Sequence, residues 1–145
     1  MKRKVIIIML LTILLITGCN KIEKQGIKNN NKEVISSMKV TINNEEYIME
    51  LENNKTVEEF INKLPQELKM DELNGNEKYV YLDFSLTSNP VNPKHINKGD
   101  VMLFGDNCLV IFYKSFDTSY SYTKIGHIDN MSELGTDSIN VKFEK

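Results

Sequence analysis

The stretch Lys98–Lys114, KGDVMLFGDNCLVIFYK, decides the fold class of this chain. Within it, the apolar runs Val101–Phe104 and Cys108–Lys114 lie on either side of the turn Gly105–Asn107. Two short runs rich in β-branched and aromatic residues, separated by a turn that contains glycine, predict a β-hairpin. This is the clearest hairpin signal in the 145 residues, and it favours a mainly β fold.

The sequence on both sides of this hairpin repeats the pattern. Met38–Ile42 alternates apolar and polar residues, and after the turn Asn43–Glu45 the residues Tyr47, Met49 and Leu51 share one face of a second strand. Further strands are expected at Glu67–Glu72, Tyr79–Phe84, Tyr120–Ile128 and 139–144. Seven or eight short strands favour a small closed barrel, because closure leaves no exposed sheet edge.

One helix is expected before Glu67. Thr56–Glu59 has the form of a capping box, in which the threonine hydroxyl accepts from the N3 amide and the glutamate reaches back. Apolar side chains at helical spacing then form one stripe, which we expect to cover an open end of the barrel: Val57, Phe60, Ile61 and Leu64. Pro65 ends the helix, and a second, single helical turn is expected at Met131–Leu134.

The first eighteen residues have the form of a secretory leader. Basic Met1–Lys4 precedes the apolar run Val5–Ile16, whose 12 residues are too few to cross about 30 Å of hydrocarbon comfortably. The run ends in Leu15–Cys19, LITGC, which resembles the lipobox of bacterial lipoproteins. That resemblance implies cleavage after Gly18 and a diacylglyceryl thioether on Cys19. An ordinary signal peptide with a chance cysteine and an uncleaved anchor are the alternatives.

The chain is therefore expected to divide into a signal peptide (1–18), a flexible tether (19–37) and a barrel domain (38–145). The tether contains Asn29–Asn31 and shows no periodicity, although a short helix over 21–37 is the alternative. Two acyl chains on Cys19 would anchor the protein stably to a membrane. We expect it in the cell envelope, on the extracytoplasmic side of that membrane.

The charge balance argues against nucleic acid as a partner. Lysine and arginine number 18, aspartate and glutamate number 20, and three of the basic residues lie in the leader. The remaining chain has 15 basic and 20 acidic side chains, so its net charge is near −5. It also has no basic run, which a general nucleic-acid binder would use to contact phosphates.

Several segments together resemble a bacterial family of cyclophilin-like domains. They are Lys98–Lys114, Ser119–Ile128, the opening hairpin, the helix ending in Leu64-Pro65, Leu73–Tyr79 and Val141–Glu144. Because these parts recur in order from about Met38 to Lys145, the resemblance is specific. It implies a closed eight-stranded β-barrel with one or two short helices. Most members of the family have no assigned activity, so the resemblance does not by itself imply a function.

The resemblance raises the question of prolyl isomerase activity. Cyclophilins weaken the imide bond with an arginine that donates toward the prolyl nitrogen, but the single arginine of this chain, Arg3, lies in the leader. Lysine lacks the planar fork of a guanidinium and is a weak substitute. We therefore expect a ligand- or peptide-binding module without efficient isomerase activity. An extracytoplasmic prolyl isomerase is the main alternative, and a structural domain that docks another envelope protein is the third.

Aromatic and polar residues of the barrel domain are the candidates for binding. Tyr79 with Tyr81, and Tyr120 with Tyr122, are i, i+2 pairs, so each pair is expected on one face of its strand. Tyrosine combines a flat apolar ring with a polar end, which suits a peptide or small-molecule groove. The complete expected set is Tyr79, Tyr81, Asn107, Phe112, Tyr113, Ser119, Tyr120 and Tyr122. Alternatively, some of these rings belong to the core.

Other chemistry has little support in the sequence. His95 and His127 lie 32 residues apart, and Cys108 is a lone cysteine inside an apolar run, typical of a small buried hydrophobe. There is no CxxC or HxxH pair and no glycine-rich phosphate loop. Lys124 and His127 are the cationic groups of the predicted strand Tyr120–Ile128 and could meet a carboxylate, although a solvated strand face is the simpler interpretation. We expect no metal, no cofactor and no catalytic residue.

Overall fold

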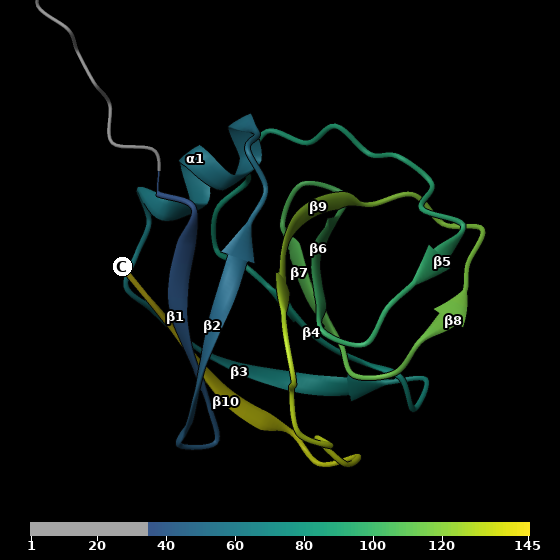
Figure 1. The fold of residues 1–145 in the computed structure, drawn as a ribbon. Helices are drawn as coiled ribbons and strands as arrows, with labels where there is room; N and C mark the ends of the chain where they lie inside the picture. The colour runs from purple at the N-terminus through teal and green to yellow at the C-terminus, as the bar shows by residue number, and fades with distance from the viewer. Residues whose placement is uncertain (1–34) are drawn as a thin grey trace, which may run out of the picture. The chain divides into compact units, whose positions relative to one another are not determined.

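The computed structural model of this protein describes residues 35–145 (Figure 1). The predicted leader, the lipidation site Cys19 and nearly all of the predicted tether lie outside the described residues. The first strand begins at Ser37, one residue before the predicted start of the barrel domain. Within 35–145, no helix has the length and apolar character needed to cross a membrane.

Eight antiparallel strands close into a barrel in the order β1-β10-β3-β4-β7-β6-β9-β2. The elements are β1 (Ser37–Ile42), β2 (Glu45–Leu51), α1 (Lys55–Ile61), β3 (Gln66–Leu73), β4 (Glu77–Tyr81), β5 (His95–Ile96), β6 (Asp100–Phe104), β7 (Cys108–Phe112), β8 (Phe116–Asp117), β9 (Thr123–Ile128) and β10 (Ile139–Glu144). The short strands β5 and β8 pair with each other beside the barrel. The predicted closed barrel of about eight strands is confirmed.

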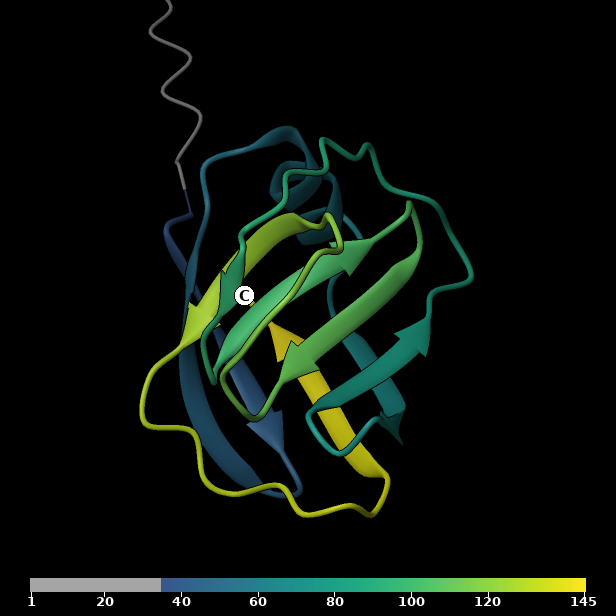
Figure 2. The same ribbon diagram turned by 90° about the vertical axis from the view of Figure 1, so that its right-hand side faces the viewer.

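Two hairpins follow the sequence patterns closely. In the first, Val40 lies opposite Tyr47, and the turn residues Asn43 and Asn44 have positive φ angles of 47° and 74°. Asparagine tolerates this left-handed backbone, which suits the tight turns that match the twist of a hairpin. In the second, Leu103 lies opposite Leu109 across the predicted turn. Figure 2 shows β6 and β7 side by side, with β4 next to β7.

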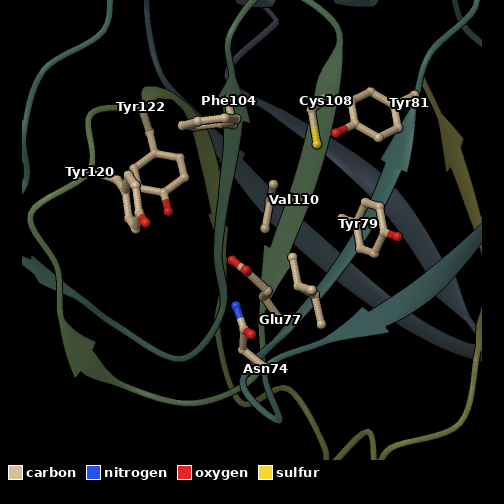
Figure 3. A pocket seen from close by; sticks show the side chains of 10 residues that line it. Asn74, Glu77, Tyr79, Tyr81, Phe104, Cys108, Val110, Tyr120 and Tyr122 are labelled. Atoms are coloured by element: carbon tan, nitrogen blue, oxygen red, sulfur yellow. The ribbon is translucent and has the colours of Figure 1, made fainter.

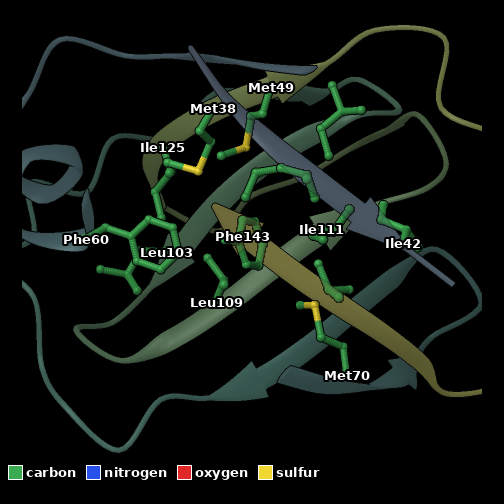
Figure 4. Close-up of a cluster of buried hydrophobic side chains, with 14 of the residues drawn as sticks. Met38, Ile42, Met49, Phe60, Met70, Leu103, Leu109, Ile111, Ile125 and Phe143 are labelled. Carbon is green, nitrogen blue, oxygen red and sulfur yellow. The ribbon is translucent and has the colours of Figure 1, made fainter. Parts of the chain in front are cut away.

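The inward-facing residues of the strands fill the barrel. Alternate residues of a strand point to opposite faces, and one set forms a large buried cluster (Figure 4). We call this the inner cluster; its members on the strands are Met38, Val40, Ile42, Met49, Met70, Val101, Leu103, Leu109, Ile111, Ile125, Ile128, Ile139, Val141 and Phe143. Helix α1 lies at one end of the barrel (Figure 1), where Phe60 meets Phe143 edge to face at 5.4 Å. All four residues of the predicted stripe pack in or against the inner cluster, but the helix ends at Ile61, so Leu64 lies beyond it and the predicted end at Pro65 is wrong.

The N-terminus of the helix differs from the prediction. The cap is Asn54, whose side chain accepts from the Val57 amide at 3.0 Å, so the predicted capping box at Thr56 is wrong. The helix starts at Lys55, and Thr56 and Glu59 therefore turn to the loop after β4 instead. Glu59 accepts from both the amide and the hydroxyl of Thr87, at 2.7 and 2.9 Å, and Thr56 donates to the Thr87 carbonyl.

Strand bounds also differ in the second half of the chain. The predicted strand Tyr120–Ile128 begins only at Thr123. Tyr122 pairs instead with Val91, in the loop between β4 and β5, through two backbone hydrogen bonds. The strand predicted at Tyr79–Phe84 likewise runs as β4 and ends at Tyr81. Met131–Leu134 forms no helical turn: it follows a left-handed Asn130 and runs irregularly, with Met131 buried against the inner cluster. Among the described residues, α1 is the one helix.

Candidate ligand-binding pocket

The outer face of β6 and β7 carries a second apolar cluster. Its residues alternate with those of the inner cluster, so they point away from the barrel interior. The segments around β5 and β8 and the residues before β9 cover much of it. We call this the outer cluster; its buried members are Ile96, Met102, Cys108, Val110, Phe112 and Tyr122. It is smaller than the inner cluster, and it is not covered on every side.

A pocket of about 430 Å³ opens beside the outer cluster (Figure 3). We call it the tyrosine pocket. Four parts of the chain form it: the end of β3 with the turn that follows, the outward-facing residues of β4, those of β6 and β7, and the segment before β9. Its lining residues are Leu73, Asn74, Glu77, Tyr79, Tyr81, Phe104, Cys108, Val110, Tyr120 and Tyr122. Figure 3 shows Tyr79 and Tyr81 on one side, and Phe104, Tyr120 and Tyr122 on the other.

The two aromatic walls are built differently. On β4, Tyr79 and Tyr81 pack edge to face with ring centroids 6.0 Å apart, and Tyr81 is 67% exposed. On the other wall, the ring centroid of Phe104 lies 6.2 Å from that of Tyr120 and 5.6 Å from that of Tyr122. Tyr120 is 64% exposed, whereas Tyr122 is buried. Tyr81 on the first wall, and Tyr120 with Phe104 on the second, are therefore exposed rings that a ligand can contact.

Glu77 places a carboxyl group among these apolar side chains. It is the first residue of β4 and is only 9% exposed. Burial raises the pKa of Glu77, and the nearby Glu72 raises it further, while a hydrogen bond from Asn74 opposes the shift. Among the side chains of residues 35–145, no cation forms an ion pair with Glu77.

The thiol and hydroxyl beside Glu77 are kept neutral. Burial raises the pKa of Cys108, and the charge of Glu77 adds to that shift. Burial and Glu77 raise the pKa of Tyr122 in the same way. Because the thiolate is the nucleophilic form of cysteine, Cys108 is a weak nucleophile at neutral pH. The arrangement suits noncovalent binding better than covalent catalysis.

A smaller cavity of about 190 Å³ adjoins the tyrosine pocket. The two share Asn74, Glu77, Tyr120 and Tyr122 in their linings, and Asn76 and Ser119 line the smaller one. The Oδ1 atom of Asn76 is buried and accepts no hydrogen bond from residues 35–145. A buried acceptor without a donor is costly unless a water or a ligand supplies one.

The expected binding residues fall into two groups. Tyr79, Tyr81, Tyr120 and Tyr122 line one pocket, and Ser119 lines the adjoining cavity. The other three residues do not line either cavity. Phe112 is buried behind Tyr122, with ring centroids 5.4 Å apart, and Asn107 donates to the Leu82 carbonyl at the hairpin tip. Tyr113 belongs to the inner cluster, and its hydroxyl lies 3.2 Å from Glu72. Sequence reasoning missed Glu77, although it shares a strand face with Tyr79 and Tyr81.

The remaining titratable side chains do not form a second candidate site. His127 and Lys124 form ion pairs with buried Asp100, at 2.9 and 3.4 Å, and neither lines the tyrosine pocket. Asp100 also accepts from the Asn97 amide at 2.9 Å, so these groups tie β6 to β9. In the part of the chain that the structure describes, no three His, Cys, Asp or Glu side chains converge as metal ligands would.

Comparison with known proteins identifies the fold. The model of a family described as the cyclophilin-like family matches residues 40–144. The solution structure of the hypothetical protein AF2241 from Archaeoglobus fulgidus is similar, with a TM-score of 0.51 at 20% sequence identity. The match covers 75% of this chain and 93% of the archaeal chain, and at that identity it shows the fold alone. No curated protein matches the chain.

Proposed function

Because this chain belongs to the cyclophilin-like family, whose fold alone specifies no activity, we propose a function from its pocket. We propose that the protein is a membrane-tethered module that binds a small molecule or an extended peptide in the tyrosine pocket. One observation carries the proposal. A cavity of about 430 Å³ brings four tyrosines and a buried glutamate together on one face of the barrel.

The composition of the pocket supports binding. Ligand sites are mostly apolar concavities with a few polar groups that fix orientation, and volumes of roughly 300–1,000 Å³ are usual. The exposed rings of Tyr81 and Tyr120 supply contact area, while Glu77 and Asn74 supply polar atoms. The wall residues are also held in place, since Tyr122 packs on Phe112 and its backbone pairs with Val91.

The same composition disfavours the rival function, prolyl isomerisation. Isomerases of this fold aim a guanidinium at the prolyl nitrogen, and the sequence beyond Arg3 contains no arginine. Neither lysine nor histidine lines the tyrosine pocket. Its one ionisable acid, Glu77, is an acceptor when charged, the opposite of the donor that this chemistry needs.

The membrane tether is the second part of the proposal. It rests on the sequence LITGC at Leu15–Cys19 and on the apolar run before it. A diacylglyceryl group on Cys19 would hold the barrel near the extracytoplasmic membrane surface, where the tyrosine pocket would meet ligands of the cell envelope.

Ligand binding is tested on the protein purified in full length from its own membranes. We expect a bound molecule to be detected by native mass spectrometry and to be lost in Tyr120→Ala. Ile48→Ala is the matched control, because Ile48 is 61% exposed and does not line the pocket. An empty wild-type protein, or a ligand that survives Tyr120→Ala, contradicts the proposal. Proline turnover within tenfold of a standard cyclophilin, abolished by Tyr122→Ala, would establish the rival.

The tether is tested separately by fractionation. Cys19→Ser is expected to release the protein from membranes into the soluble fraction, because the acyl acceptor is gone. Cys108→Ser is the control, and it should remain membrane-bound. Unchanged membrane retention of Cys19→Ser would show that lipid on this cysteine is not the anchor.

A further inference from the structure

Glu77 differs from the other buried charges of the barrel, because Lys78 is satisfied by two carbonyl groups and Asp100 by two cationic side chains. Lys78 is fully buried, and its Nζ donates to the carbonyls of Gly135 and Asp137 at 2.8 and 2.7 Å. Asp100 is buried against His127 and Lys124. For Glu77, by contrast, the polar partner in residues 35–145 is Asn74, which is neutral. A buried carboxylate without a cation is unfavourable, so a ligand cation would relieve it.

A second acceptor near Glu77 also lacks a hydrogen-bond donor. Asn76 lines the adjoining cavity that also contains Glu77, and its Oδ1 atom is buried without a hydrogen-bond donor. Glu77 and Asn76 therefore both bring acceptor oxygens to this part of the molecule, and neither has a cationic donor among residues 35–145. An ammonium group has three N–H donors and no acceptor, and a guanidinium has five. Both match this excess of acceptors.

The aromatic walls favour the same kind of group. Tyrosine rings carry negative charge on their faces, and cations within about 6 Å of a ring centroid are attracted to them. Figure 3 shows the carboxyl group of Glu77 between Val110 and the pair Tyr120 and Tyr122. Apolar Val110, Cys108 and Phe104 complete the lining, so the space around Glu77 suits a cationic head on an apolar stem.

We propose that the tyrosine pocket recognises an organic cation, an ammonium or guanidinium group on an aliphatic stem, with Glu77 as its counter-ion. This inference rests on the proposed binding function and names the ligand class. Two sources carry the ammonium form of this chemistry, a free aliphatic amine and a lysine side chain of a peptide, and the test uses that form. A bare metal ion fits poorly, because Ca²⁺ and Mg²⁺ need several oxygen ligands and the lining supplies one carboxylate.

The test uses the full-length protein in an uncharged detergent, observed by NMR through the amide signals of pocket residues. The free-amine arm compares n-pentylammonium with n-pentanol. The peptide arm compares acetyl-Gly-Lys-Gly-amide with the same peptide carrying norleucine, which lacks the amino group. We expect the cation to bind at least tenfold more tightly than its neutral partner in one arm or in both, and the arm that shows it identifies the source.

Variants decide whether Glu77 is responsible. Glu77→Gln keeps the shape and the hydrogen bond with Asn74, and it should reduce the preference for the cation to less than twofold. Glu50→Gln, an exposed acid that does not line the pocket, should keep the full preference. Circular dichroism confirms that each variant is folded.

The outcomes separate this inference from the proposed function. Equal binding of the neutral and cationic probes at the pocket overturns the cation inference and leaves the binding function in place. A preference for the cation that survives Glu77→Gln also overturns it. If no probe binds, the inference fails, and the co-purified ligand and its loss in Tyr120→Ala then judge the binding function independently.

Discussion

The two faces of the sheet formed by β4, β7 and β6 are filled to different degrees. On the inside, Leu109 and Ile111 of β7 are fully buried in the inner cluster, which fills the barrel. On the outside, Cys108 and Val110 of the same strand are buried in the smaller outer cluster, yet both also line an open pocket. One strand thus contributes alternately to the stability of the fold and to a surface that a ligand can reach.

Two neighbouring charges on β4 make the difference plain. The ammonium of Lys78 is satisfied by two carbonyls and lies 4.9 Å from the ring centroid of Tyr113. The carboxyl of Glu77 has a hydrogen bond with Asn74 and no ionic partner among the described residues. Lys78 is thus satisfied within the fold, whereas Glu77 is the group to which we assign a ligand cation.

The largest effect is expected from opening the inner cluster. Phe143→Ala removes a fully buried ring that packs on Phe60, so it should cost about 3–5 kcal/mol of the free energy of unfolding. Tyr120→Ala, on the pocket wall, should change that free energy by no more than about 0.5 kcal/mol while it removes ligand binding. Urea denaturation of both variants measures the two losses in the free energy of unfolding. Equal losses would contradict the difference between the filled inner face and the open outer face.

A smaller loss of stability is expected at Lys78. Lys78→Ala leaves the carbonyls of Gly135 and Asp137 without their donor, and it should cost about 2–3 kcal/mol in urea denaturation. Lys142→Ala is the control, since its ion pairs with Glu67 and Glu144 lie at the protein surface, where water and salt screen them, so its loss of stability should be clearly smaller. If the two lysine variants lose the same stability, Lys78 does not have the structural role described here.

The smallest effect is a gain of stability. Glu77→Gln removes an unpaired buried acid and should raise the free energy of unfolding at neutral pH by about 1 kcal/mol. The pKa of Glu77 in the folded protein is raised above its usual 4.5, so the wild type gains stability as pH falls from above the raised pKa toward that value. The advantage of Glu77→Gln should therefore shrink at low pH. A variant that is less stable than the wild type at pH 7 would contradict this.

The barrel could be predicted because its signals are local. The turn residues Asn43–Glu45 and Gly105–Asn107, with apolar strand patterns on both sides, predict two hairpins, and the structure confirms both. Period two also divides each strand into two faces, so the inner residues Ile139, Val141 and Phe143 followed from the pattern.

The pocket could be predicted only in part, because it depends on contacts distant in sequence. Tyr122 leaves the barrel to pair with Val91, and nothing within the segment 119–128 signals that. Glu77 stands after the turn Asn74–Asn76 and resembles an ordinary polar turn residue; its burial arises from β7 and the segment before β9. The helix cap failed for the same reason, since Thr56 and Glu59 bind Thr87, about 30 residues away.

The central claim is that Glu77 is a buried acid that binds a ligand cation. The most direct test is the pH titration of the Glu77 carboxyl group. The side-chain carboxyl of Glu77 can be followed by ¹³C NMR as a function of pH, in the full-length protein with and without n-pentylammonium. The account predicts a pKa above the usual value in the free protein, lowered by the ammonium and unchanged by n-pentanol. A normal pKa in the free protein, or one that does not respond to the ammonium, would contradict it.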